Sequence, residues 1–191
     1  MTGVQTCALP IYGDNLQGAR LGVDHLLALG HRRIGMVTGR RDLVSAQLRE
    51  RGYREAHAAA GVDVDESLLQ PGAYESEQAR QAARDLLQLP DPPTAVFAAN
   101  DLSALSTLEV AAELGVDVPG QLSVVGFDNI PESAMAHPPL TTVQQPIRQM
   151  GHDAIAMLVG LIAGEELADT HITLDTTHVL RRSTAAPGGK K

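Results

Sequence analysis

The chain has 191 residues, about the length of one domain, and 43% of them are apolar while 20% are charged, as in an ordinary globular protein. Fifteen basic residues stand against 23 acidic ones, so the net charge of −8 argues against direct binding of these residues to a nucleic-acid backbone. One cysteine excludes an internal disulfide, and no stretch reaches the ~20 consecutive apolar residues of a membrane-spanning helix.

The first twelve residues differ in character from the rest. Residues 1–11 carry no charge and lack the basic segment of a signal peptide, and they back-translate, from a GTG start, into a string that resembles a common sequencing adapter. We therefore expect residues 1–12, with Cys7 among them, to be a non-native leader; the alternative is a native, disordered N-terminus. A native codon run through this segment in the source DNA would contradict the leader hypothesis.

From residue 16 onward, helical periodicity alternates with short apolar runs. Leu21, Val23, Leu26 and Leu27 share one helix face, which Gly30 ends. Asp101 is a plausible cap for a later helix. Further elements are predicted, in chain order, as strand 34–37, helix 45–60, weak strand 68–70, helix 76–87, strand 95–98, helix 101–114, strand 122–126, a loop from 131, strand 142–143, helix 146–162, strands 172–174 and 178–180, and a disordered tail 185–191.

The predicted strands are continuously apolar and separated by helices, which indicates an α/β fold with a parallel sheet flanked by helices on both faces. In such folds ligands bind beyond the carboxyl ends of the strands. The segments that follow the strands are therefore the places to look for a site, namely residues 40–49, 100–101, 128–129 and 144–145.

The sequence lacks the common constellations of catalysis. There is no G-x-G-x-x-G turn for a dinucleotide, no phosphate-binding loop with its lysine, and no G-x-S-x-G turn of a serine hydrolase. The seven histidines show no close pair with metal-ligand spacing. We expect no enzyme activity, no cofactor and no metal.

Several spaced segments together resemble the sensor domain of LacI/GalR-family transcriptional regulators. They are residues 29–34 (LGHRRI), 99–105 (ANDLSAL), 118–129 (VPGQLSVVGFDN), 140–146 (LTTVQQP) and 180–184 (LRRST). The resemblance covers residues 13–184 and implies the C-terminal lobe of a two-lobed, periplasmic-binding-protein-like sensor. It also implies that residues 145–171 belong to the otherwise missing N-terminal lobe, and that the helix-turn-helix headpiece and hinge helix lie outside this chain.

The resemblance implies five effector-binding residues. Asp128 would accept hydrogen bonds from adjacent sugar hydroxyls, and Asn100 would both donate and accept. Arg49 would fork onto ligand oxygens, Gln145 would contact the ligand at the crossover between lobes, and the ring of Tyr74 would lie on an apolar sugar face. The alternatives are a helix cap for Asp128, a turn-forming role for Asn100 and a solvent-facing helix position for Arg49.

The resemblance further implies a cytoplasmic regulator in which a small effector, such as a sugar, shifts the balance between open and closed lobes and so changes operator affinity. Operator DNA would be bound only through the missing headpiece, and the protein would be a homodimer. Residues 102–114 and 135–140 are candidate dimer surfaces, although Leu105, Leu108 and Val110 could equally be core. The competing interpretation is a periplasmic sugar-binding protein of a transporter.

Overall fold

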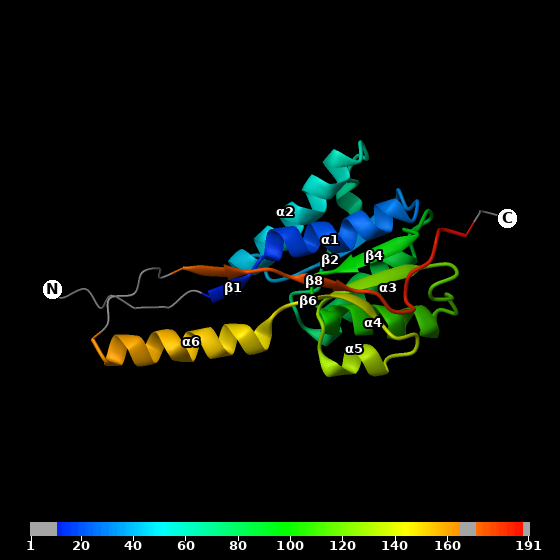
Figure 1. Ribbon diagram of the computed structural model, residues 1–191. Helices are drawn as coiled ribbons and strands as arrows, with labels where there is room; N and C mark the ends of the chain where they lie inside the picture. Colours follow the sequence, from blue (N-terminus) through cyan, green and yellow to red (C-terminus); the bar gives the residue numbers. More distant parts are fainter. Residues whose placement is uncertain (1–10, 165–170, 189–191) are drawn as a thin grey trace.

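A computed structural model of the chain describes residues 11–164 and 171–188 (Figure 1). The strands are β1 Ile11–Gly13, β2 Ile34–Thr38, β3 Leu69–Pro71, β4 Ala95–Ala98, β5 Ser123–Asp128, β6 Thr141–Gln144, β7 Ile172–Leu174 and β8 Thr177–Val179. The helices are α1 Asn15–Ala28, α2 Val44–Ala59, the 3-10 turn η1 Glu66–Leu68, α3 Ser76–Leu87, α4 Asp101–Glu113, α5 Pro131–Met135 and α6 Ile147–Ile162.

Six strands form one sheet in the order β3-β2-β4-β5-β6-β8, and every neighbouring pair is parallel except β6 and β8. The strands β2 and β4 are buried along their whole length, as their continuously apolar sequences predict for the centre of a covered sheet. The predicted parallel sheet is therefore confirmed.

Helices cover the sheet on both faces (Figure 1). On one face, Leu26 of α1 and Tyr53 of α2 pack with Phe97 and Phe127 of the central strands. On the other face, α3 and α4 bury a second cluster against Val96 and other strand residues. The predicted doubly covered α/β lobe is thus observed, with its core on both sides of β4 and β5.

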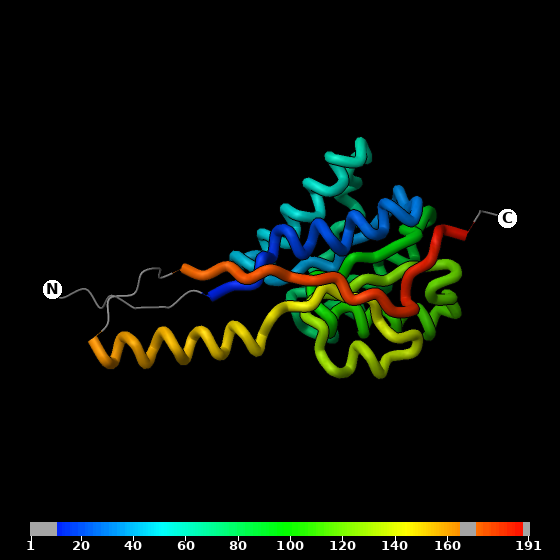
Figure 2. Tube along the Cα trace, viewed as in Figure 1, coloured from blue at the N-terminus to red at the C-terminus, as the bar shows by residue number. Residues whose placement is uncertain are grey.

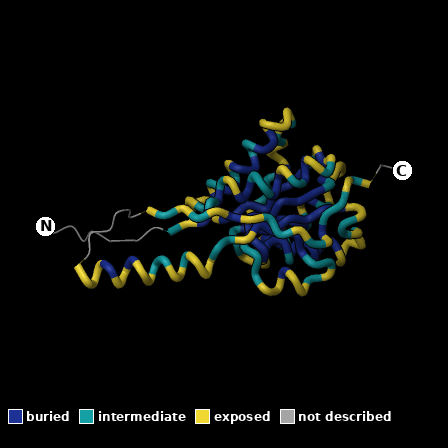
Figure 3. The backbone as a smooth tube through the Cα atoms, viewed as in Figure 1, coloured by how far each residue is buried: buried dark blue, intermediate teal, exposed yellow. Residues whose placement is uncertain are grey.

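A second unit projects from the body of the lobe. In it β1 pairs with β7 in parallel, Ile11 opposite Ile172, and α6 lies beside β1 (Figure 2). Ile11 and Tyr12, which fall within the expected leader, form part of β1, and residues 1–10 lie outside the described residues. The non-native origin of the leader stays a prediction. Most of α6 is exposed, with only Met157 and Gly160 buried (Figure 3).

Three expectations about single segments need correction. The weak strand begins at Leu69 because η1 takes up the residues before it, and the loop expected from Pro131 contains the short helix α5. The tail expected from residue 185 is ordered at its start, because the backbone of Ala185 bonds with the hydroxyl of Ser123 and with His31. Residues 189–191 lie outside the described part.

Within residues 11–164 and 171–188, no helix combines the length and apolar character needed to cross a bilayer.

Candidate functional site

The predicted site residues come from elements that meet at the carboxyl edge of the sheet. Asn100 follows β4, Asp128 ends β5 and Gln145 follows β6. Arg49 comes from the first half of α2, and Tyr74 from the turn between β3 and α3. Because parallel strands all end at one edge, residues far apart in the sequence gather there.

Arg49 lies at the centre of this edge, with its side chain only 6% exposed. Its Nε donates to Oδ1 of Asn15 at 2.8 Å, and its Nη1 donates to the carbonyl oxygen of Ala99. The guanidinium carbon stands 3.7 Å from the ring centroid of Phe127, a cation–π contact. Burial lowers the pKa of Arg49, and the charge of Asp128 opposes this shift. The alternative of a solvent-facing helix position for Arg49 is therefore wrong.

Asp128 receives two donors on one oxygen. Oδ1 lies 3.4 Å from Nη1 of Arg49 and 2.7 Å from Nε2 of Gln145. Burial raises the pKa of Asp128, while Arg49 and the hydrogen bond from Gln145 oppose the rise. The short helix α5 begins without a side-chain cap, so Asp128 is no helix cap. The structure thus brings Asp128 into contact with both Arg49 and Gln145.

Tyr74 stands farther from this cluster. Its ring centroid is 5.8 Å from the guanidinium carbon of Arg49, and the ring lies against Gly39, where an added Cβ would come within 2.3 Å of it. The hydroxyl of Tyr74 is buried, and no described residue forms a hydrogen bond with it. The ring of Tyr74 therefore sits beside Arg49 and behind the loop that follows β2.

Asn100 caps α4, and Asp101 does not. The Oδ1 of Asn100 accepts from the backbone N–H of Ser103 at 2.9 Å, which is the geometry of an N-cap. The prediction that Asp101 caps this helix is therefore wrong, because its side chain turns toward β6 and β5 instead. There Thr142 donates to one carboxylate oxygen and the N–H of Ile130 to the other.

Two further residues belong to the cluster without having been predicted, Asn15 and Phe127. Phe127 stands within a segment that already pointed to the family, next to Asp128. Asn15 stands at the start of α1, where its own Nδ2 donates to the carbonyl oxygen of Gly13. Neither carried a motif signal of its own, since their role follows from contact with Arg49.

A cleft of about 480 Å³ opens beside the cluster. Polar groups of Asn15, Arg49 and Gln145 lie on it, and its wall also includes Tyr12, Gly13, Asp42, Leu43, Val44, Ser45 and Met150. Charged and amide groups that meet an otherwise partly apolar wall are typical of a small-ligand site. Among the described residues, no group of three His, Cys, Asp or Glu side chains is placed to hold a metal ion.

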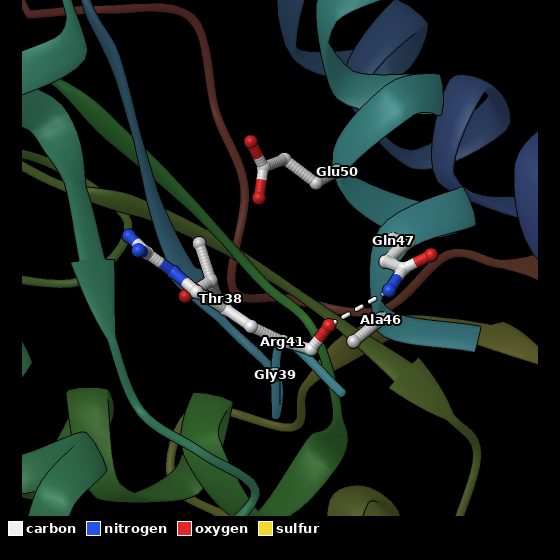
Figure 4. Close-up of a pocket in the computed structure, with 6 residues that line it drawn as sticks. All are labelled: Thr38, Gly39, Arg41, Ala46, Gln47 and Glu50. Atoms are coloured by element: carbon white, nitrogen blue, oxygen red, sulfur yellow. Dashed lines mark hydrogen bonds between the residues drawn. The ribbon is translucent and has the colours of Figure 1, made fainter. Parts of the chain in front are cut away.

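A second hollow of about 390 Å³ lies on the same edge, between the end of β2 and α2 (Figure 4). Thr38, Gly39, Arg41, Gln47 and Glu50 line it, together with Ala46. The side chain of Gln47 donates to the backbone carbonyl oxygen of Arg41 at 2.8 Å and so fixes the loop between β2 and α2. This loop borders both hollows.

Comparison with known proteins gives the family. A family model for the periplasmic binding protein-like domain matches residues 23–184. The chain is 36% identical over 176 residues to the HTH-type transcriptional repressor CytR of Escherichia coli K12, covering 92% of this chain and 52% of that protein. It is 38% identical over 170 residues to the HTH-type transcriptional regulator CelR of Thermobifida fusca, covering 89% and 50%.

The chain belongs to the LacI family as a sensor domain. Solved structures of that family agree with the fold: a CelR–cellobiose complex superposes with a TM-score of 0.86 at 38% identity, covering 91% of this chain and 53% of that one. A LacI-family regulator from Mycobacterium smegmatis gives 0.85 at 31% identity, covering 93% and 66%. The chain spans about half the length of the curated relatives it matches.

Proposed function

We propose that this LacI-family sensor domain binds a neutral, polyhydroxylated effector, a sugar, in the cleft beside Arg49. The observation that carries the proposal is that Arg49 and Gln145 line this cleft and that both donate to the carboxylate of Asp128. In this proposal the effector shifts the lobes toward a closed arrangement and so changes the affinity of the protein for its operator. The protein acts in the cytoplasm, and a headpiece outside this chain binds the DNA.

The chemistry of Asp128 supports a polyol. Both of its donors reach Oδ1, and Oδ2 has no hydrogen-bond partner among the described residues. A carboxylate oxygen of this kind accepts bonds from sugar hydroxyls. The positive charge of Arg49 is already balanced by Asp128, which favours a neutral ligand over a phosphate. The cellobiose complex of CelR, a relative at 38% identity, supports the same class.

The projecting unit supports a second lobe. Five apolar side chains of α6 are between 47% and 78% exposed, namely Ile147, Ile155, Leu158, Val159 and Ile162. An apolar helix face of this size calls for a cover. We propose that residues 145–171 belong to an N-terminal lobe, and that closure of this lobe over the cleft is the conformational change that the effector selects.

A homodimer is also part of the proposal. Leu108 and Val110 are buried within the lobe, in agreement with the alternative that they belong to the core. The apolar surface that α4 offers to a second copy is therefore smaller than its sequence suggests. Leu102 on α4 is 46% exposed, Leu114 directly after α4 is 39% exposed, and Met135 on α5 is 66% exposed. These side chains are the ones that a second copy would cover.

The test is a titration of the ¹⁵N-labelled chain, followed by NMR. Cellobiose, other neutral mono- and disaccharides, sugar phosphates and nucleosides would be added separately. We expect at least one neutral sugar to shift the side-chain amide signals of Asn15 and Gln145, which lie on the cleft. Shifts caused only by phosphates, or only at residues remote from the cleft, would contradict the proposal.

The regulator is distinguished from the competing periplasmic sugar-binding protein by its gene. The relatives compared above are named as transcriptional regulators, which favours the regulator. An in-frame helix-turn-helix segment upstream of codon 13 is the expected finding. A secretory signal followed by the missing lobe would favour the transporter protein instead.

A further inference from the structure

A buried carboxylate stands directly behind the candidate site. Asp101 has no exposed surface, although it occupies the first position of α4. It does not cap the helix and does not line the cleft. A buried charge without a function in helix capping needs another set of partners, because desolvation is costly. That cost is visible here, since burial raises the pKa of Asp101 to about 6.

The partners of Asp101 come from the two segments that carry Asp128 and Gln145. Thr142 of β6, three residues before Gln145, donates its hydroxyl to Oδ1. The backbone N–H of Ile130, two residues after Asp128, donates to Oδ2 at 2.9 Å. One carboxylate thus ties the end of β5 to β6 from behind.

Strand β5 leaves room for the carboxylate of Asp101. A Cβ added to Gly126 of β5 would come within 2.3 Å of Oδ1 of Asp101, so the carboxylate occupies the space that a side chain would need. Gly126 is also the register partner of Thr142 across β5 and β6. The carboxylate of Asp101 therefore packs against Gly126 of β5 and bonds to its register partner Thr142 on β6.

The turn that Asp101 holds has an unusual backbone. Asp128 has φ of 120° and Asn129 has φ of 61°, and neither is glycine. Such conformations persist only where the surroundings fix them. Two hydrogen bonds hold this turn: the N–H of Ile130 donates to Asp101, and Nη2 of Arg181 donates to Oδ1 of Asn129 at 2.6 Å.

We propose that Asp101 is a positioning residue for the effector site: its carboxylate holds the turn at residues 128–130 against β6 and thereby sets Asp128 in register with Gln145 and Arg49. The value of this register for affinity rests on the proposed function. The effect on geometry does not, because it is present in the chain without effector.

The distinguishing variants are Asp101→Ala and Asp101→Asn. Alanine removes both acceptors. The amide of asparagine can still accept from Ile130 through its oxygen, while its NH₂ group donates to the Thr142 hydroxyl, which can reverse its role. The matched control is Ser103→Ala, in the same turn of α4, because the Ser103 hydroxyl is buried and bonds to no described residue.

The measurement is hydrogen exchange and ¹⁵N NMR of the chain without effector. For Asp101→Ala we expect the amide of Ile130 to exchange at least tenfold faster and the side-chain amide of Gln145 to shift. The amide of Val125, in the centre of the sheet, should exchange as in the wild type. Asp101→Asn and Ser103→Ala should resemble the wild type in all three signals.

Two results would overturn the proposal. One is that the exchange rate of the Ile130 amide and the side-chain amide signal of Gln145 are unchanged in Asp101→Ala. The other is that the Val125 amide exchanges faster by the same factor as the Ile130 amide, which would indicate a general loss of stability. If Asp101→Ala does not fold, Thr142→Val removes one of the two bonds alone, and the same two signals should move in the same direction. Unchanged signals in that variant would overturn the proposal equally.

Affinity gives the second readout. With a neutral sugar that binds the wild type, Asp101→Ala should bind about tenfold more weakly and Asp101→Asn within about threefold of the wild type. Equal losses in both variants would contradict a positioning role. If no sugar binds the wild type, the proposed function fails, while the exchange experiment still decides the role of Asp101.

Discussion

Nη1 of Arg49 lies 3.4 Å from Oδ1 of Asp128; the side chain of Arg49 is 6% exposed and lines the cleft, and that of Asp128 is 22% exposed. The same guanidinium lies over the ring of Phe127 and donates to Asn15. Each charge thus offsets part of the cost of burying the other. This pairing explains how Arg49 is held inside the lobe, whereas Arg51 and Arg54 on the same helix reach solvent.

Arg49→Met should destabilise the chain markedly. The substitution leaves Asp128, Asn15 and the carbonyl of Ala99 without the donor they share, and breaking a buried pair costs about 3–5 kcal/mol. We expect the free energy of unfolding in urea to fall by roughly 3 kcal/mol. The control is Arg84→Met, whose partially exposed pair with Glu113 should contribute about 0–1 kcal/mol. Equal losses in the two variants would contradict the buried role of Arg49.

Asp128→Asn should affect binding more than folding. The amide keeps the shape of the side chain and can still accept from Gln145, but it loses the charge that faces Arg49 and the hydroxyls of the proposed effector. We expect calorimetry with a sugar that binds the wild type to show at least a tenfold weaker Kd, the effect of about 1.4 kcal/mol. Asp85→Asn, at an exposed carboxylate on α3, is the control and should bind as the wild type does. Equal affinities in all three proteins would remove Asp128 from the site.

His178 should make the chain less stable in acid. Burial, and then the neighbouring charge of His25, lowers its pKa from 6.5 to about 4. Between those two values the unfolded chain binds more protons than the folded one, so this contribution to stability is lost as the pH falls from 6.5 toward 4. His25, His31 and His57, whose pKa values are also lowered by burial, act in the same direction.

The check is the Tm at pH 7.5 and pH 5 for the wild type, His178→Gln and the control His152→Gln. The drop in Tm between the two pH values should be smaller in His178→Gln than in the wild type. It should be unchanged in the control, because His152 is exposed. Asp101 acts in the opposite sense, since its pKa is raised to about 6, but it is present in all three proteins and cancels in the comparison. A drop of the same size in all three would contradict the prediction.

Gly52→Ala should separate α1 from α2. A Cβ at this position would meet the backbone oxygen of Leu16 at 2.4 Å and Cβ of Ala19 at 2.8 Å, and backbone cannot move aside cheaply. Overpacking of this kind costs about 1–3 kcal/mol. The matched control is Gly151→Ala in α6, where no described residue beyond its own stretch of helix comes within 4 Å of the added Cβ and alanine is the better helix former. We expect a lower Tm for the first variant only.

Local patterns predicted most of the lobe. Helix 76–87 and strand 95–98 match the structure because Pro90, Pro92 and Pro93 separate the two segments and the hydrophobic pattern of each is clear. The cap of α4 was assigned to the wrong residue because either Asn100 or Asp101 satisfies the local pattern. The choice depends on Thr142 and Ile130, which are distant in the sequence.

The residues of the candidate site were likewise predicted only in part. The resemblance to a family led to Arg49, Asp128 and Gln145, which the structure brings together. It did not lead to Asn15, whose contact with Arg49 joins the start of α1 to the first half of α2 across the packed helices. Contacts of this kind depend on how helices cross, and no motif in a single segment encodes them.

The exposed apolar face of α6 should cause the chain to associate in solution. Ile155 and Val159 lie one helical turn apart and are 63% and 59% exposed, so they form an apolar surface that the described part of the chain does not cover. Such surfaces promote association. We expect Ile155→Glu combined with Val159→Lys to reduce light scattering and binding of an apolar dye, without lowering the Tm of the lobe. The control is Met157→Glu, because Met157 is one of the few buried residues of α6 and its replacement should loosen the helix from β1. Scattering that is unchanged by the double substitution would show that another surface drives association.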